Sequence, residues 1–262
     1  MAAFFEATSS DRERVAPMDH AKVALVTGSA TGIGRAVAWG FAARGYSVTV
    51  NYSRSQAEAE ETAEGVRSRG GRALVIRADV ADDTAVRVMV ERTVDAFGGL
   101  DVLVNNAATT VFVPHTDLDG LTGPVWDDIL NVNLKGTFFG CRAAMPHLKA
   151  RQGNIVNIAS VAGVAGSGSS IAYAASKGAV ITLTKSLAKA FAPEVRVNAV
   201  APGPVQTRWL ADHPEMIESA MKFTPLKRPA TPEDVAAVAL FLADGTSLMT
   251  GQVLVVDGGR TI

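Results

Sequence analysis

The sequence predicts an α/β protein in which a doubly wound parallel sheet of about seven strands carries helices on both faces. Two observations predict this fold. Short apolar runs alternate with longer helical patterns along the chain, as in parallel sheets whose crossovers are helices. The first apolar run, Val23 to Val26, enters a glycine-rich turn at 27–34 and leaves as a helical pattern that reaches Arg44. Ligands of such sheets lie beyond the carboxyl ends of the strands.

Size and composition limit the possible function classes. The 262 residues are 48 % hydrophobic and 19 % charged, enough for one domain with a sizeable core. We expect residues 1–20 to form an N-terminal extension and residues 21–262 to form this domain. A net charge of -1 without a long basic block argues against nucleic acid as a partner. No apolar run reaches the roughly eighteen residues of a membrane span, and the single Cys141 favours a reducing cytoplasm.

The other elements follow in alternating order after the first strand and helix. Further strands are expected at 46–51, 73–78, 102–104, 154–158, 195–200 and 253–256, and further helices at 56–69, 82–97, 126–150 and 173–191. The longest irregular stretch, about 203–232, is predicted to be a flexible substrate lid.

The glycine-rich turn predicts a site for an anionic cofactor. Gly28, Gly32 and Gly34 precede a helix, whose N-terminus offers unpaired amide donors and a partial positive charge. Glycines let a diphosphate approach these amides without obstruction by side chains. A tight connection without a ligand is the alternative interpretation of the same spacing.

Tyr173 and Lys177 are the first candidates for chemistry. A spacing of four on a helix places both side chains on one face. A nearby ammonium favours the phenolate, so we expect it to lower the pKa of Tyr173 from about 10 toward working pH. The tyrosine could then exchange a proton with a substrate oxygen. A half-buried tyrosine beside a solvated lysine is the alternative.

Ser160, thirteen residues before Tyr173, completes a set of motifs that resembles the short-chain dehydrogenase/reductase family. The resemblance covers about residues 21 to 259 and implies a Rossmann-type fold, a dinucleotide-binding catalytic domain and hydride transfer between NAD(P)(H) and a carbonyl or secondary alcohol. Ala108 is one departure, because the family usually has glycine there and an added methyl would narrow the space beside the cofactor. The matching segments are Thr27-Gly-x-x-x-Gly-x-Gly34, Asn105-Asn-Ala, Asn133, Ser160, Tyr173-x-x-x-Lys177, Pro202-Gly203 and Thr250-Gly-Gln-x-x-x-Val-Asp-Gly-Gly259.

The resemblance also implies roles for the catalytic residues. Tyr173 would be the general acid in reduction and the base in oxidation, and Ser160 would hydrogen-bond the substrate oxygen. Lys177 would hold the hydroxyls of the nicotinamide ribose and depress the tyrosine pKa. Asn133 would position a water that connects Lys177 to solvent; a helix-interior asparagine bonded locally is the alternative.

The end of the second strand predicts the choice of cofactor. A carboxylate there would bind the ribose hydroxyls of NAD and repel the 2′-phosphate of NADP. The chain instead has Asn51-Tyr52-Ser53-Arg54, in which Asn51 replaces the acid and Arg54 could bind the phosphate. NADP(H) is therefore favoured and NAD(H) remains possible. Arg54 could also be an ordinary solvated residue, and Thr31 stands where many NADP-using relatives carry a basic residue.

Further cofactor contacts are implied by the resemblance alone. Asp79 and Val80 would contact adenine, and Thr207 would contact the nicotinamide amide or the diphosphate. Alternatively, Asp79 could cap the next helix and Thr207 could close a turn. No residues with metal-ligand spacing are found. The remaining expected contacts come from the glycine turn and from later strand ends: Ser29, Thr31, Ile33, Asn105, Ala107, Pro202, Gly203, Val205 and Thr207.

Substrate and assembly are less determined by the sequence. Candidate substrate contacts are Val111, Val164, Trp209 and Met216, which suggest a modest small-molecule carbonyl or alcohol. The 3-oxoacyl-carrier-protein reductases are the first relatives to consider, but Ala192-Pro193-Glu194 lacks the basic residue that they often carry there. Alternatives are an NAD-dependent alcohol or sugar dehydrogenase and a catalytically silent sensor or scaffold. The apolar helices at 126–150 and 173–191 predict a homotetramer or a homodimer.

Overall fold

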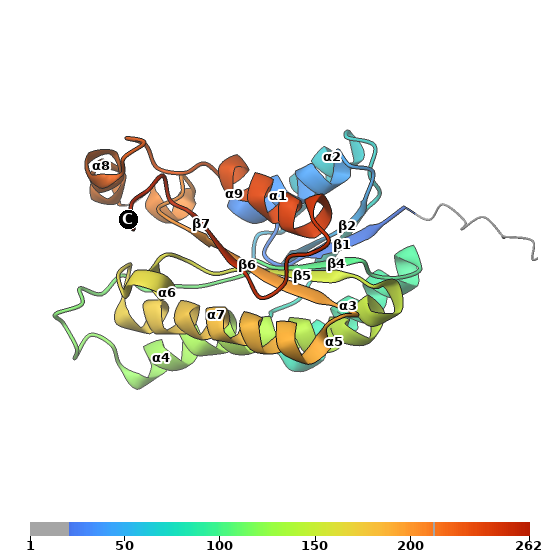
Figure 1. Ribbon diagram of the computed structural model, residues 1–262, viewed down its shortest axis with the longest axis horizontal. Helices are drawn as coiled ribbons and strands as arrows, with labels where there is room; N and C mark the ends of the chain where they lie inside the picture. Colours follow the sequence, from blue (N-terminus) through green and yellow to red (C-terminus); the bar gives the residue numbers. More distant parts are fainter. Residues whose placement is uncertain (1–20, 212) are drawn as a thin grey trace, which may run out of the picture.

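The computed structural model describes residues 21–211 and 213–262, and its centre is one parallel sheet of seven strands. The strand order is β3-β2-β1-β4-β5-β6-β7, so the chain winds outward in both directions from β1 (Figure 1). The predicted doubly wound sheet is confirmed. The strands are β1 (Val23–Val26), β2 (Ser47–Tyr52), β3 (Ala73–Arg77), β4 (Val102–Asn105), β5 (Asn154–Ile158), β6 (Arg196–Pro202) and β7 (Val253–Val256).

Helices cover both faces of the sheet (Figure 1). One face carries α1 (Gly32–Ala42), α2 (Gln56–Arg67) and α9 (Pro232–Leu240). The other face carries α3 (Asp83–Phe97), α4 (Gly123–Leu130), α5 (Gly136–Arg151) and α7 (Ile171–Phe191). The short α6 (Ala162–Ala165) precedes α7, and α8 (Pro214–Phe223) follows β6.

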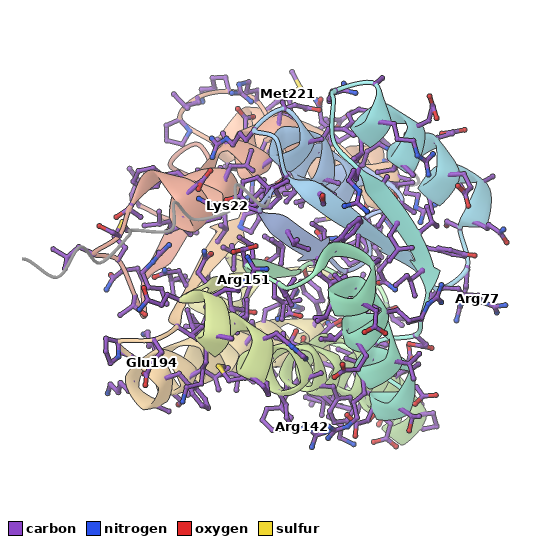
Figure 2. All side chains as sticks on the ribbon, turned by 90° about the vertical axis from the view of Figure 1, so that its right-hand side faces the viewer. Lys22, Arg77, Arg142, Arg151, Glu194 and Met221 are labelled. Atoms are coloured by element: carbon purple, nitrogen blue, oxygen red, sulfur yellow. The ribbon has the colours of Figure 1, made fainter. Side chains whose placement is uncertain are left out.

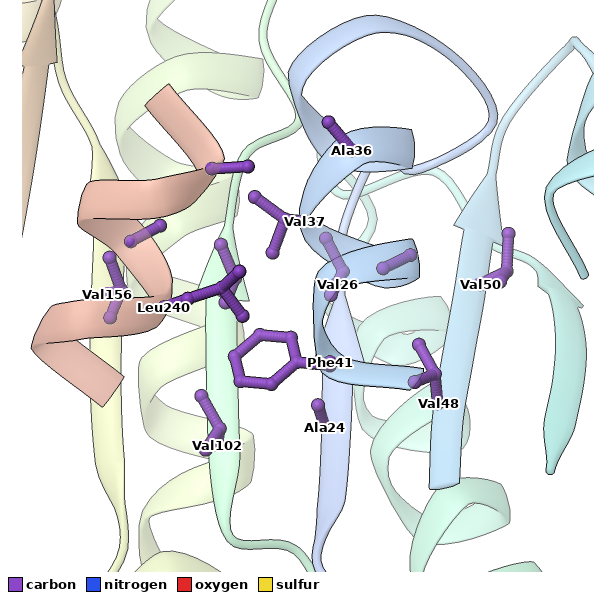
Figure 3. Packing of buried hydrophobic residues seen from close by; sticks show 14 of the residues in the cluster. Ala24, Val26, Ala36, Val37, Phe41, Val48, Val50, Val102, Val156 and Leu240 are labelled. Atoms are coloured by element: carbon purple, nitrogen blue, oxygen red, sulfur yellow. The ribbon is translucent and has the colours of Figure 1, made fainter. Parts of the chain in front are cut away.

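The inner strands are continuous apolar runs because helices bury both of their faces. All four residues of β1 are fully buried. Figure 3 shows Phe41 of α1 between Ala24 of β1, Val102 of β4 and Leu240 of α9. This packing holds α1 against the sheet.

Three features of the fold differ from the sequence prediction. The helix expected at 126–150 is α4 and α5 joined by a π-helical segment, Asn131–Lys135. Helix α9 was not predicted; its start is fixed by a capping box in which Thr231 and Asp234 bond each other's backbone N–H. The stretch 203–232, expected to be irregular, contains α8 and a 3₁₀ turn, Arg208–Leu210.

The surface shows mixed charge (Figure 2). Arg142 and Glu194 lie on the helical layer of α5 and α7, while Lys22 and Arg77 lie at other parts of the surface. Within the described residues, no helix is long and apolar enough to cross a membrane. Nor does the described part of the chain hold a cluster of three metal-ligating side chains. The expected N-terminal extension, residues 1–20, lies outside the described residues.

Candidate active site

A cavity of about 700 Å³ is lined by residues that follow the carboxyl ends of the strands. Its volume is within the roughly 300–1,000 Å³ usual for ligand sites. The predicted site residues that line it are Gly28, Thr31, Gly32, Ile33, Asn51, Tyr52, Ser53, Arg54, Asp79, Val80, Ala107, Ser160, Tyr173, Lys177, Pro202, Gly203, Val205 and Thr207. Ala108, the departure from the family pattern, also lines it.

The glycine turn is shaped for close approach. Gly28 has φ +60°, and a Cβ there would lie 2.8 Å from the Cα of Ala107. A Cβ at Gly34 would lie 2.6 Å from the carbonyl oxygen of Gly28, so Gly34 packs the helix start against the turn and does not line the cavity. The amides at the start of α1 therefore remain open to a diphosphate. This fits the predicted cofactor site better than a connection without a ligand.

Ser29 and Asn105, two predicted cofactor contacts, lie behind the cavity wall. The hydroxyl of Ser29 donates to the carbonyl of Val26 and accepts the amide of Asn51. The Asn105 side chain donates to Asn157 Oδ1 at 2.9 Å. Neither residue is among those lining the cavity. Both side chains hold the strand ends together. Local sequence patterns could not show this, because the bonding partners depend on strand pairing.

Asn51 has a structural role that the sequence interpretation missed. Its side-chain oxygen accepts the amide of Gly28 at 3.0 Å, and its side-chain nitrogen donates to the carbonyls of Ile76 and Ala78 at 3.3 and 3.0 Å. The residue is buried, although it borders the cavity. Asn51 thus fixes the glycine turn to the ends of β2 and β3, and its carboxamide is not a free substitute for a ribose-binding carboxylate.

We therefore expect Asn51→Asp to lower stability and not simply to shift cofactor preference. A carboxylate cannot donate to the two carbonyls, and an unpaired buried polar group costs about 1–3 kcal/mol. Urea unfolding of the variant should show a loss of this size. Asn157→Asp, a similarly buried control in β5, tests the general cost of such a carboxylate. If the Asn51→Asp variant were as stable as wild type and changed its cofactor preference, Asn51 would after all act as a replacement for the ribose-binding carboxylate.

Helix α7 positions Tyr173 and Lys177, and a tight contact with α6 brings Ser160 to them. A Cβ at Gly163 would lie 2.5 Å from the carbonyl carbon of Lys177, so only glycine lets α6 rest on the backbone of α7. The Oγ of Ser160 accepts a hydrogen bond from the amide of Ala162, the first residue of α6. This bond holds the serine next to the helix that contacts α7. Ser160, Tyr173 and Lys177, three of the four predicted catalytic residues, line one cavity.

Lys177 is not a solvated lysine. Its side chain is buried, Nζ donates to the carbonyl of Ile158 at 2.8 Å, and Nζ lies 5.8 Å from the centre of the Tyr173 ring. Burial lowers the pKa of Lys177 to about 8. The ammonium thus faces the phenol in a low-dielectric environment, as the catalytic interpretation requires.

The acidity of Tyr173 differs from the sequence expectation. Burial raises the pKa of Tyr173 to about 12, and a side-chain hydrogen bond with Ser160 opposes that rise. The expectation that the ammonium would bring the pKa of Tyr173 toward working pH is therefore wrong. Burial outweighs the other effects, which the sequence could not show. A phenol of this acidity is fully protonated near neutrality and suited to donate a proton.

Asn133 is fully buried in the π-helical segment and does not line the cavity. Its Oδ1 accepts the amide of Thr109 at 2.8 Å, and its Nδ2 donates to the carbonyl of Thr109 and the hydroxyl of Ser176, both at 3.0 Å. The carboxamide is therefore committed to protein atoms. It fixes the loop after β4 to α7, one turn from Tyr173.

One end of the cavity is lined by residues that follow β2 and β3 and by residues of the segment 203–211. Arg54 is exposed there, next to Ser53 and Tyr52. Asp79 accepts the amide of Ala81 and so closes a turn, whereas α3 is capped by Asp82. The described residues 51–54, at the end of β2, include no carboxylate.

The part of the cavity beside Tyr173 is lined by side chains of the loop after β4 and of the segment that follows β6. The Trp209 ring meets that of Tyr173 edge-on at 6.2 Å. Phe112 stacks on His213 at 3.6 Å and thereby joins the loop to the lid. Trp209 and Met216 line the cavity as predicted, but Val111 and Val164 do not. Phe112, Arg208 and Arg260 also line it, and no motif in the sequence marked them.

Comparisons with known proteins agree with this geometry. The family described as enoyl-(acyl carrier protein) reductase matches residues 28–261. A solved short-chain dehydrogenase/reductase from Serratia marcescens, in mutant form, superposes with a TM-score of 0.85 at 34 % identity, covering 92 % of this chain and 98 % of its own. The chain belongs to the short-chain dehydrogenase/reductase family.

Similar members of the short-chain dehydrogenase/reductase family are named for different carbonyl and alcohol substrates. A ketoacyl reductase assigned to the granaticin polyketide synthase of Streptomyces violaceoruber is 48 % identical, over 91 % of this chain and 96 % of its own. The 3-oxoacyl-[acyl-carrier-protein] reductase FabG of Staphylococcus aureus is 41 % identical, over 92 % and 99 %. The 3beta-hydroxysteroid dehydrogenase 1 of Eggerthella lenta is 39 % identical, over 92 % and 94 %. The protein is accordingly an oxidoreductase that acts on small molecules and uses NAD(P)(H).

Proposed function

We propose that this short-chain dehydrogenase/reductase reduces a ketone with NADPH and that Tyr173 is the proton donor. The observation that carries the proposal is the buried ammonium of Lys177, which has a backbone carbonyl as its partner and faces the Tyr173 ring. Burying a charge without a carboxylate destabilises a fold. A silent dinucleotide-binding scaffold would have no use for this arrangement.

The chemistry divides between the cofactor and the chain. When bound, the reduced nicotinamide supplies the hydride. Ser160 donates a hydrogen bond to the ketone oxygen and stabilises the charge that develops on it. Tyr173 Oη transfers its proton to that oxygen, and the ammonium of Lys177 stabilises the phenolate left behind. In the reverse direction the phenolate would accept the proton of an alcohol.

The part of the cavity beside Tyr173 supports an apolar ketone. Phe112, Trp209 and Met216 add aromatic and aliphatic surface to the cavity that Tyr173 lines, and the Trp209 ring lies next to that of Tyr173. A 3-oxoacyl thioester is the first candidate because two similar relatives are named for ketoacyl or oxoacyl reduction. An alicyclic ketone is the second, and a sugar or other polar alcohol used with NAD is the third.

Cofactor consumption with a substrate panel tests the proposal. The panel contains a short 3-oxoacyl thioester, an alicyclic ketone, an aldose and the lactone formed by its oxidation. The two ketones and the lactone are tested with NADPH and with NADH, and the aldose is tested with NADP⁺ and with NAD⁺. We expect reduction of one of the two ketones with NADPH, and loss of that activity in Ser160→Ala. Turnover of the sugar alone, or of nothing in the panel, would count against the proposal.

The buried ammonium predicts a specific dependence of stability on pH. The pKa of Lys177 falls from 10.5 to about 8 on folding, so between these values the unfolded chain binds more protons and stability rises with pH. Below pH 8 the full cost, roughly 3 kcal/mol, is present. Lys177→Met should therefore be more stable than wild type near pH 7.

Denaturant unfolding from pH 7 to 10.5 checks this prediction. The difference between Lys177→Met and wild type should shrink as pH rises through the window. Lys185→Met, which removes an exposed lysine from the same helix, should show no such change. A methionine variant less stable than wild type at pH 7 would show that the ammonium stabilises the fold instead.

We also propose that the chain assembles as a homotetramer or homodimer in the cytoplasm. Helices α4, α5 and α7 form the outer layer on one face, and Phe138 of α5 is 39 % exposed there (Figure 1). Cys141 is buried with a thiol, which fits a reducing compartment. Light scattering should give two or four times the chain mass of 27.3 kDa. A monomer alone at micromolar concentration would contradict the proposed assembly.

A further inference from the structure

The lid is fastened to helix α2 by one arginine. Arg208 follows the strand-end turn of β6, and its Nη1 and Nη2 donate to Ser55 Oγ at 3.3 and 3.2 Å. Ser55 is the N-cap residue of α2. The Nη1 atom also lies 3.6 Å from Oε1 of Glu58, in the first turn of that helix. The hydrogen bonds to Ser55 join residues that are 153 positions apart in the sequence.

Thr207 and Arg208, here called the strap, lie along the cavity. Within the strap, Thr207 packs over the start of α1, where a Cβ on Gly32 would lie 3.2 Å from the threonine methyl. Arg208 then continues to the start of α2, and it lines the cavity together with Ser55 and Arg54. The guanidinium-bearing residues Arg54 and Arg208 therefore line the same cavity as the amides at the start of α1, where a diphosphate would bind.

The present partners of Arg208 are weak ones for a guanidinium. Ser55 is a neutral acceptor, and the ion pair with Glu58 is half exposed, with side-chain exposures of 57 % and 40 %. Such pairs contribute little to stability because solvent screens them. A phosphomonoester carries about -1.5 to -2 charges and three acceptor oxygens, which match a guanidinium far better.

We propose that Arg208 is a second binding residue for the 2′-phosphate of NADP(H), and that Glu58 is an internal competitor that holds its guanidinium when no phosphate is present. Binding of the phosphate exchanges the Glu58 carboxylate for a phosphate oxygen and keeps the lid fastened. NAD(H), which lacks that phosphate, leaves Arg208 with Ser55 and Glu58. The inference rests on the proposed NADP preference and adds a lid residue to its determinants.

Titration calorimetry with two cofactor fragments tests the proposal without turnover. The full chain is titrated with adenosine 2′,5′-bisphosphate and with adenosine 5′-monophosphate, which differ in the 2′-phosphate. Arg208→Ala should weaken bisphosphate binding roughly ten- to a hundredfold, as expected for loss of a charge-assisted hydrogen bond. Monophosphate binding should stay within about twofold. Glu58→Gln should act in the opposite direction and strengthen bisphosphate binding severalfold, because it removes the competing charge.

Arg67→Ala and Glu64→Gln are matched controls. They alter an exposed ion pair of the same helix that does not line the cavity, and they should leave both affinities unchanged. Equal weakening of both fragments by Arg208→Ala, or weaker bisphosphate binding in Glu58→Gln, would overturn the inference.

The outcomes also separate this inference from the proposed function. If the bisphosphate binds more tightly than the monophosphate and only Arg54→Ala removes the difference, the NADP preference stands and the role of Arg208 fails. If the wild-type chain does not distinguish the two fragments, the NADP preference fails and the inference fails with it.

Discussion

Tyr173→Phe is expected to lower kcat for ketone reduction by about 10² to 10⁴, the usual contribution of a positioned proton donor. Phenylalanine keeps the ring that meets Trp209 edge-on and removes only the hydroxyl. Cofactor affinity should therefore stay within a few-fold of wild type.

Steady-state kinetics and cofactor titration on the same preparation separate these effects. Thr184→Val, which removes a buried hydroxyl farther along α7, is a control for loss of a hydroxyl from this helix and should keep its turnover. If the Tyr173→Phe protein retained more than half of the wild-type kcat, another group must supply the proton.

Arg54→Ala is expected to weaken NADPH binding roughly ten- to a hundredfold more than NADH binding. A hydrogen bond between the guanidinium and the 2′-phosphate contributes about 1.5–3 kcal/mol, and NADH lacks the phosphate. The exposed position of Arg54 means that the fold should tolerate the change.

Dissociation constants for both cofactors, measured at two salt concentrations, check the role of Arg54. Screening by salt should reduce the selectivity of wild type more than that of the variant. Arg77→Ala is the control, since Arg77 is exposed at the neighbouring strand β3 and does not line the cavity. A variant that loses affinity for both cofactors equally would place Arg54 outside the phosphate site.

The sequence predicted the features that local patterns determine. Alternating apolar runs and helical patterns predicted the sheet because helices bury both of its faces. The four-residue spacing of Tyr173 and Lys177 placed both side chains on one helical face, and the structure has them on one cavity wall. The glycine spacing predicted a turn whose backbone lies open to an anionic ligand. The structure shows why glycine is needed at position 28, since a Cβ there would lie 2.8 Å from the Cα of Ala107.

The roles that were missed depend on partners distant in the sequence. Asn51 bonds the carbonyls of Ile76 and Ala78 only because β2 pairs with β3 in one particular register. Arg208 reaches Ser55 only because the lid folds back over α1.

The pKa of Tyr173 is another property that spacing cannot give, because burial by the assembled fold determines it. Local spacing thus identifies the reacting groups. Tertiary packing decides which of them are accessible and how acidic they are.

The most direct test of NADPH-dependent ketone reduction is kcat/KM of the wild-type enzyme for NADPH and for NADH, measured with the same ketone at saturation. We predict a ratio of at least about ten in favour of NADPH, from one charge-assisted hydrogen bond to the 2′-phosphate. A ratio at or below one would contradict the account, because Arg54 and Arg208 would then have no phosphate to bind and Thr31 would be the better guide to the cofactor.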